Sequence, residues 1–304
     1  MARHPIDLDG PPRAPVPTPA QAFALFGAGF LTLVVAAQVV EWVALRVSVP
    51  REDWHAVASD PARNPVLSDG LWIVALTALP ELALGALVLL TVRSRGFNPR
   101  LVLPLTLPSP AAMLGALLVV FGVAPLADAV HSWASHCPWV PSIFAEGASA
   151  SSLVERAVGG RGALGLAVSL LGLAAVPALV EEALFRGFVT AAFRSSDAAA
   201  LLAPSALFAL FHLDPAQVAA TLCLGLAFGL ARLCTGSLVA SMTAHAAYNG
   251  VVLTLTYAAG GDAGEAPSLA GVVVGLGAAV AGVLLMVRGP ARGDPVAGAR
   301  GGGT

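Results

Sequence analysis

Charged side chains are scarce in this sequence. Only 11% of its 304 residues are charged, whereas a soluble domain carries about 25%. Hydrophobic residues make up 57% of the chain, and the mean hydropathy is +0.81. This composition excludes an ordinary cytosolic protein and a disordered chain. It predicts a membrane protein.

The sequence also contains no lysine, and its cysteines are too few to form a framework of disulfide bonds. All 16 basic residues are arginine, which together with the many Ala and Gly residues indicates coding bias and a bacterial source. The net charge of −2 leaves no basic surplus, so we expect no nucleic-acid partner. The cysteines Cys137, Cys223 and Cys234 are odd in number, and two lie in apolar stretches, which excludes a secreted disulfide scaffold.

Long apolar runs recur along the chain. A helix needs about 20 apolar residues to cross the hydrocarbon layer. The runs therefore predict an all-α, polytopic transmembrane helix bundle of about eight spans in contact with the lipid bilayer. We expect these spans at 20–46, 71–92, 111–130, 162–192, 198–213, 216–233, 237–258 and 268–287.

The distribution of arginine among the loops predicts the orientation of the chain in the membrane, because cytoplasmic loops are enriched in Arg and Lys. Arg93, Arg95 and Arg100 crowd one short loop without an acidic residue, so we expect that loop to be cytoplasmic. Alternation of the spans then places both termini on the cytoplasmic side of a bacterial inner (cell) membrane. The 131–160 loop is expected outside.

Three spans carry polar motifs that hydrocarbon tolerates poorly. The fourth contains Glu181-Glu182-Ala-Leu-Phe-Arg186, the fifth Phe208-Ala-Leu-Phe-His212 and the seventh His245-Ala-Ala-Tyr-Asn249. Residues four apart share a helix face, so Glu182 lies over Arg186, Phe208 over His212 and His245 over Asn249. Glu181 is turned by about 100° from Glu182 and has no basic partner on its own helix.

The three motifs lie at similar depth. Glu181 and His212 are each roughly 20 Å along their helices from the same cytoplasmic turn, at 1.5 Å per residue. His245 and Asn249 lie on a helix that starts from the same side. We therefore expect one carboxylate, two imidazoles and an amide to meet within the membrane. Glu81, inside the second span, either lines this cavity or pairs with an arginine.

The motifs Glu-Glu-x-x-x-Arg, Phe-x-x-x-His and His-x-x-x-Asn, with Thr235-Gly236-Ser237-Leu238 before the last, resemble those of the CPBP family of intramembrane proteases. This family includes type II CAAX-processing endopeptidases and bacteriocin-processing relatives. The resemblance covers about 160 to 255. It implies that Glu181 and His212 activate a water, that His245 and Asn249 hold the oxyanion, and that Glu182 and Arg186 are a supporting pair, with Phe208 in the second motif.

The N-terminal prolines, the apolar runs and the resemblance together suggest a division of the chain. Residues 1–19 are expected to form a disordered cytoplasmic tail, and 20–158 the first three spans and an outer loop. Residues 159–258 form the catalytic core, and 259–304 the last span and a cytoplasmic tail. The glycine stripes Gly225–Gly229 and Gly271–Gly275 are expected to pack helices within the chain rather than to form a dimer.

Two mechanisms and several functions remain open. Glu181, His212 and His245 are enough for a three-ligand Zn²⁺ site with an open water position. They lack, however, the His-Glu-x-x-His spacing of zincins, and we prefer a metal-free scheme with Glu181 as general base. The favoured function is a CAAX-type endopeptidase that cuts a peptide or protein substrate at the membrane. The alternatives are a non-catalytic binding or bacteriocin-immunity protein of the same fold, and a transporter.

Overall fold

The computed structural model describes residues 15–59, 66, 69–137, 156–157, 162–259 and 267–288. Most of the predicted N-terminal tail (1–14), most of the outer loop and the end of the C-terminal tail (289–304) lie outside these ranges. Within them the chain is helical and contains no strand, which confirms the all-α class.

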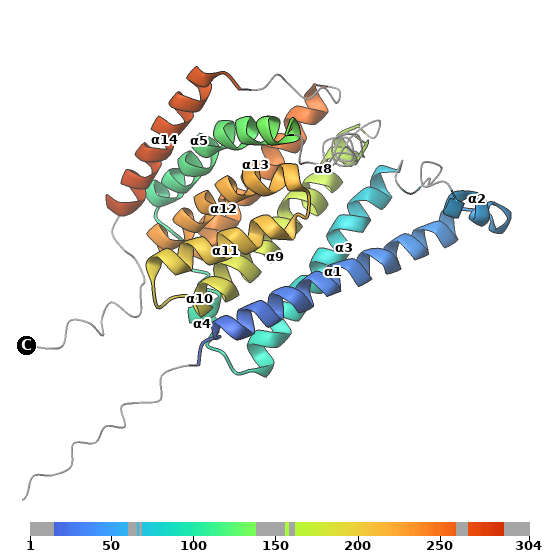
Figure 1. Cartoon of the computed structure of the whole chain (residues 1–304), viewed down its shortest axis with the longest axis horizontal. Helices are drawn as coiled ribbons and strands as arrows, with labels where there is room; N and C mark the ends of the chain where they lie inside the picture. The colour runs from blue at the N-terminus through green and yellow to red at the C-terminus, as the bar shows by residue number, and fades with distance from the viewer. Residues whose placement is uncertain are drawn as a thin grey trace, which may run out of the picture.

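The helices follow the predicted spans closely (Figure 1). The first half of the chain contains α1 (Pro19–Ser48), η1 (Arg51–Asp53), α2 (Trp54–Ser59), α3 (Gly70–Ser94), α4 (Pro99–Val102) and α5 (Pro110–Ser135). The fourth span is one continuous run of α8 (Gly162–Ser169), η4 (Leu170–Ala175), α9 (Val176–Glu182), η5 (Ala183–Val189) and α10 (Thr190–Ala192). It is followed by α11 (Asp197–Phe211), α12 (Pro215–Thr235), α13 (Leu238–Ala258) and α14 (Leu269–Arg288).

Seven helical segments of the described chain are long and apolar enough to cross a membrane. The predicted fifth span is the exception, because α11 has only 15 residues and is about 22 Å long. It is apolar and is joined to α12 by the short turn His212–Asp214. The expectation of about eight spans is therefore consistent with the structure, with seven full-length segments and one short one.

Local sequence signals explain why the spans begin where they do. Thr18 caps α1 in a capping box, with Pro19 in the first turn. Ser109 and Ser237 accept the backbone N–H three residues further on at the starts of α5 and α13. Gly236 ends α12 with a φ of 66°, a left-handed conformation that glycine adopts without steric cost.

The beginning of α1 and the end of α14 lie at the same end of the bundle, at the left of Figure 1, together with α4 and α10. Two backbone hydrogen bonds join connections at this end. Asn98 N–H donates to the Pro15 carbonyl over 3.1 Å, and Leu238 N–H donates to the Pro104 carbonyl over 2.9 Å. The loops between spans that the distribution of arginine assigned to one side of the membrane thus lie at one end of the bundle. That this side is cytoplasmic stays a prediction.

Glycine allows two helix pairs to pack closely. A Cβ atom at Gly275 of α14 would lie 2.5 Å from the carbonyl oxygen of Gly122 on α5, and one at Gly229 of α12 would lie 2.6 Å from Leu201 on α11. Gly225, Gly229 and Gly275 therefore pack helices within the chain, as predicted. Gly271 does not take part, because its only close neighbour is a side chain of the preceding turn.

Candidate active site

The fourth span has an irregular backbone around its two glutamates. The span is 31 residues long, and the segments η4 and η5 on either side of α9 are π-helical. Such segments are rare and frequently occur at functional sites. The Thr190 hydroxyl donates to the Phe185 carbonyl, five residues earlier, over 3.0 Å. Glu181 and Glu182 thus lie where α9 passes into the wider π-helical turn.

Glu182 and Arg186 form a fully buried ion pair. Arg186 Nη1 donates to Glu182 Oε1 over 3.0 Å, and both side chains are 0% exposed. The other guanidinium nitrogen, Nη2, donates to the Gly225 carbonyl of α12 over 2.8 Å. The guanidinium carbon lies 4.4 Å from the ring centre of Phe208 and 5.3 Å from that of Phe228. The arginine charge is therefore held by a carboxylate, a carbonyl and two aromatic faces.

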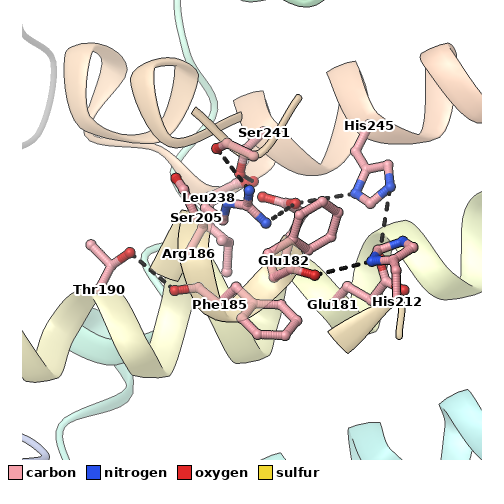
Figure 2. A network of polar contacts seen from close by, with 12 residues as sticks. Glu181, Glu182, Phe185, Arg186, Thr190, Ser205, His212, Leu238, Ser241 and His245 are labelled. Carbon is pink, nitrogen blue, oxygen red and sulfur yellow. Dashed lines mark hydrogen bonds and ion pairs between the residues drawn. The ribbon is translucent and has the colours of Figure 1, made fainter. Parts of the chain in front are cut away.

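His245 of α13 lies between the two glutamates (Figure 2). Its Nδ1 is 3.1 Å from Glu182 Oε1, and its Nε2 is 3.7 Å from Glu181 Oε2. Because a carboxylate only accepts, the proton of this first contact belongs to Nδ1. The imidazole also stacks on Phe228, with centroids 4.3 Å apart and planes at 19°. Contacts on two edges and one face thus fix the orientation of the His245 ring.

His212 follows directly after the last residue of α11. Its Nδ1 donates to the Phe208 carbonyl over 3.0 Å, so Nε2 carries the lone pair in the neutral ring. The Phe208 ring lies 4.9 Å from the ring of His212 and 5.8 Å from that of His245, both edge to face. One aromatic side chain thus contacts both imidazoles and the guanidinium of Arg186.

Asn249 stands one turn beyond His245 on α13 and is partly exposed. Its side chain makes no hydrogen bond to another described residue. The structure thus brings Glu181, Glu182 and Arg186 together with His245, and connects His212 to them through Phe208. Asn249 is connected to these residues only because it lies on the same face of α13 as His245.

The sequence did not reveal that Glu182 accepts hydrogen bonds from residues of two helices, Arg186 on its own span and His245 on α13. The spacing predicts its partner Arg186, but the contact with His245 depends on how α13 packs against α9. The adjacent glutamates carried a partial signal, because side chains about 100° apart on a helix can reach two neighbouring groups. His245 is consequently hydrogen-bonded to Glu182 and faces Glu181, whereas the sequence predicted for it a role in oxyanion binding or, if zinc is used, in metal binding.

The predicted zinc ligands do not form a metal site in this arrangement. Glu181 and His245 approach each other, yet in the described part of the chain no three side chains of His, Cys, Asp or Glu gather closely enough to hold an ion. A catalytic zinc site requires three such ligands and one open position. We therefore derive no step through a metal.

Comparison with known proteins gives one match, within the core of the chain. Residues 163–251 match the family model described as type II CAAX prenyl endopeptidase, Rce1-like. We call this segment, which is similar to that family, the Rce1-like domain. The match confirms the resemblance predicted from the motifs. No curated protein and no solved structure matches the chain.

The Rce1-like domain extends from α8 into α13 and contains all three polar motifs. The spans α1, α3, α5 and α14 lie outside it, and the chain is an integral membrane protein. The similarity of this segment to the CAAX protease family supports an endopeptidase acting at the membrane.

Proposed function

We propose that the chain is an intramembrane endopeptidase that hydrolyses a peptide bond with a water activated by Glu181 and His212. The observation that carries the proposal is the position of His245, held at Nδ1 by Glu182 with its Nε2 facing Glu181. Such a fixed constellation of acid, base and hydrogen-bond donors is what peptide hydrolysis requires.

In the first step, Glu181 accepts a proton from the water while the water oxygen bonds to the scissile carbonyl carbon. The Nε2 lone pair of His212 orients the water, because its Nδ1–H is committed to the Phe208 carbonyl. Glu181 suits the role of base since, unlike Glu182, it is not paired with the buried guanidinium.

His245 presents its second ring nitrogen to the reaction. Its Nδ1–H donates to Glu182, and its Nε2 lies 3.7 Å from Glu181 Oε2. After Glu181 has taken the proton of the water, it passes this proton to Nε2, and Nε2–H then donates a hydrogen bond to the oxyanion.

Asn249 supplies the second donor for the oxyanion. It lies on the same face of α13 as His245 and its side chain is partly exposed, so its amide is available to a substrate. One such donor typically contributes about 3 kcal/mol to transition-state stabilisation. In this scheme Phe208 and Phe228 hold the imidazoles and the guanidinium in place, and no metal is required.

The proposed substrate is a membrane-associated peptide or protein, and the printed family description suggests a prenylated CAAX tail as the first one to assay. We place the enzyme in the inner membrane of a bacterium with both termini cytoplasmic. This orientation follows from the arginine-rich loop at Arg93–Arg100.

The proposal is tested with purified protein in detergent. Wild type, Glu181→Gln and the control Glu41→Gln are incubated with a farnesylated CAAX peptide and with a bacterial membrane proteome, and products are identified by mass spectrometry. We expect cleavage by the wild type and the control and none by Glu181→Gln. Cleavage that persists in Glu181→Gln, or no wild-type cleavage in either substrate set, contradicts the proposal.

A further inference from the structure

Arg46, in the last turn of α1, lies against two tryptophan rings. Its guanidinium carbon is 3.8 Å from the ring centre of Trp54 on α2 and 4.6 Å from that of Trp42, one turn earlier on α1. Arg46 is exposed and makes no hydrogen bond or ion pair with any residue that the structure describes. Cation–π contacts engage the charge of the guanidinium but none of its five N–H donors. These donors are therefore available to a ligand.

Hydrogen bonds fix the connection in which this cluster lies. Trp54 Nε1 donates to the Val49 carbonyl at the end of α1 over 3.0 Å. Trp72 Nε1, at the start of α3, donates to the Ser48 hydroxyl over 3.0 Å. Three of the five tryptophans of the chain thus gather where α1 ends and α3 begins. The rings beside Arg46 consequently belong to a built structure that joins α1, α2 and α3.

The cluster lies at the level of the lipid headgroups. α1 has 30 residues and is about 45 Å long, as thick as a bilayer with its headgroups, whereas the hydrocarbon layer is about 30 Å thick. If that layer is centred on α1, it ends about 38 Å from the start of the helix, between Trp42 at about 35 Å and Arg46 at about 41 Å. Figure 1 shows α2 and the end of α1 at the right, far from α4 and α10.

The charges around Arg46 indicate which ligand group it recognises. Arg51, Glu52 and Asp53 form η1 and are exposed, so that together with Arg46 the local charge is zero. Such a surface does not select a ligand by its overall charge. The planar fork of an arginine does, however, match the paired oxygens of a phosphate. A phosphodiester is the group that phospholipids carry at the depth where Arg46 lies.

We propose that Arg46, with the rings of Trp42 and Trp54, binds the phosphodiester of a membrane phospholipid. The guanidinium N–H groups donate to the phosphate oxygens, and the two indole rings lie where headgroup and acyl chain meet, as is typical of tryptophan. Trp42 is 57% exposed, so one side of the site is open to the lipid. The site belongs to spans outside the Rce1-like domain, and lipid binding there does not depend on hydrolysis.

Native mass spectrometry of the purified protein tests the site. The probes are dioleoyl phosphatidylethanolamine, dioleoyl phosphatidylglycerol and dioleoylglycerol, which has the same acyl chains without a phosphate. Wild type and the control Arg51→Gln should retain both phospholipids to a similar extent and much less dioleoylglycerol. Arg46→Gln should bind the phospholipids about 10-fold more weakly or less, because a charged hydrogen-bond donor is lost. Equal binding by Arg46→Gln and Arg51→Gln, or equal retention of dioleoylglycerol by the wild type, overturns the proposal.

A second pair of variants decides the question if Arg46→Gln does not fold. Trp42 and Trp133 are 57% and 66% exposed, so replacing either with leucine removes little packing, but only Trp42 lies beside Arg46. Trp42→Leu should weaken phospholipid binding by about 2–5-fold relative to Trp133→Leu, as for an exposed cation–π contact. Equal affinities contradict the proposal. The soluble headgroup glycerophosphoethanolamine should not displace the lipid, and displacement would assign the site to a soluble phosphate compound instead.

Discussion

The adjacent glutamates of the fourth span should respond in opposite ways to the same substitution. Glu182 accepts from Arg186 Nη1 over 3.0 Å and from His245 Nδ1 over 3.1 Å, and Arg186 is completely buried. Glu182→Gln keeps the shape but removes the charge that balances the guanidinium. Removing one partner of a buried ion pair costs about 3–5 kcal/mol. We expect this variant to lose folded yield, thermal stability and activity together.

Glu181→Gln should instead abolish turnover with little loss of stability. The Glu181 carboxylate lies 3.7 Å from His245 Nε2, beyond ordinary hydrogen-bond distance, and it does not pair with Arg186. Replacing it with a neutral amide removes the base and a negative charge that is costly to bury. The fold keeps the Glu182–Arg186 pair and the His245–Glu182 contact.

A double variant completes the comparison. Glu182→Gln combined with Arg186→Met removes both charges and should recover part of the yield lost in Glu182→Gln. Recovery should be incomplete, because Arg186 also donates to the Gly225 carbonyl over 2.8 Å and lies on the ring of Phe208. Thermal unfolding in detergent and peptide turnover are measured for all four proteins. If Glu181→Gln misfolds, or Glu182→Gln is stable yet inactive, the two roles are assigned the wrong way round.

Four further outcomes are expected. Asn249→Ala should lower peptide turnover by about 10²-fold, as for other oxyanion donors, while the melting temperature stays unchanged. Gly275→Val should destabilise the protein by about 1–3 kcal/mol, because a Cβ there meets the Gly122 carbonyl at 2.5 Å, whereas Gly277→Ala enters open space and should be neutral in the same unfolding assay. A strong chelator should leave turnover unchanged, and metal analysis near one equivalent per chain contradicts the metal-free scheme. In a variant whose three native cysteines are replaced, Arg95→Cys should react with a membrane-impermeant thiol reagent only after the cells are opened, and labelling from outside reverses the predicted topology.

The span boundaries could be predicted because the chain marks them with both hydropathy and capping residues. Runs of about 20 apolar residues begin directly after Thr18, Ser109 and Ser237, whose side chains cap the helix that follows. The fifth span differs because hydropathy continues through Phe211, while the backbone leaves the helix at His212 and Leu213 takes a φ of 55°. A hydropathy profile does not reveal such a turn.

The candidate site was predictable within each helix but not between helices. Four-residue spacing fixes the pairing of Glu182 with Arg186 and of Phe208 with His212, since these contacts are local. The contact of His245 with Glu182 depends on helix packing. So do the π-helical turns around α9. The sequence of one helix does not encode these relations.

The short α11 also has a consequence for the surrounding lipid. Its 15 residues span about 22 Å, whereas the hydrocarbon layer is about 30 Å thick, and Leu202 and Leu210 on its surface are more than half exposed. Lipids beside α11 must shorten or tilt, so the bilayer is locally thinned on the side where α11 turns into α12. That turn carries His212 and Asp214, so headgroups and water come closest to the chain where the proposed hydrolysis needs water.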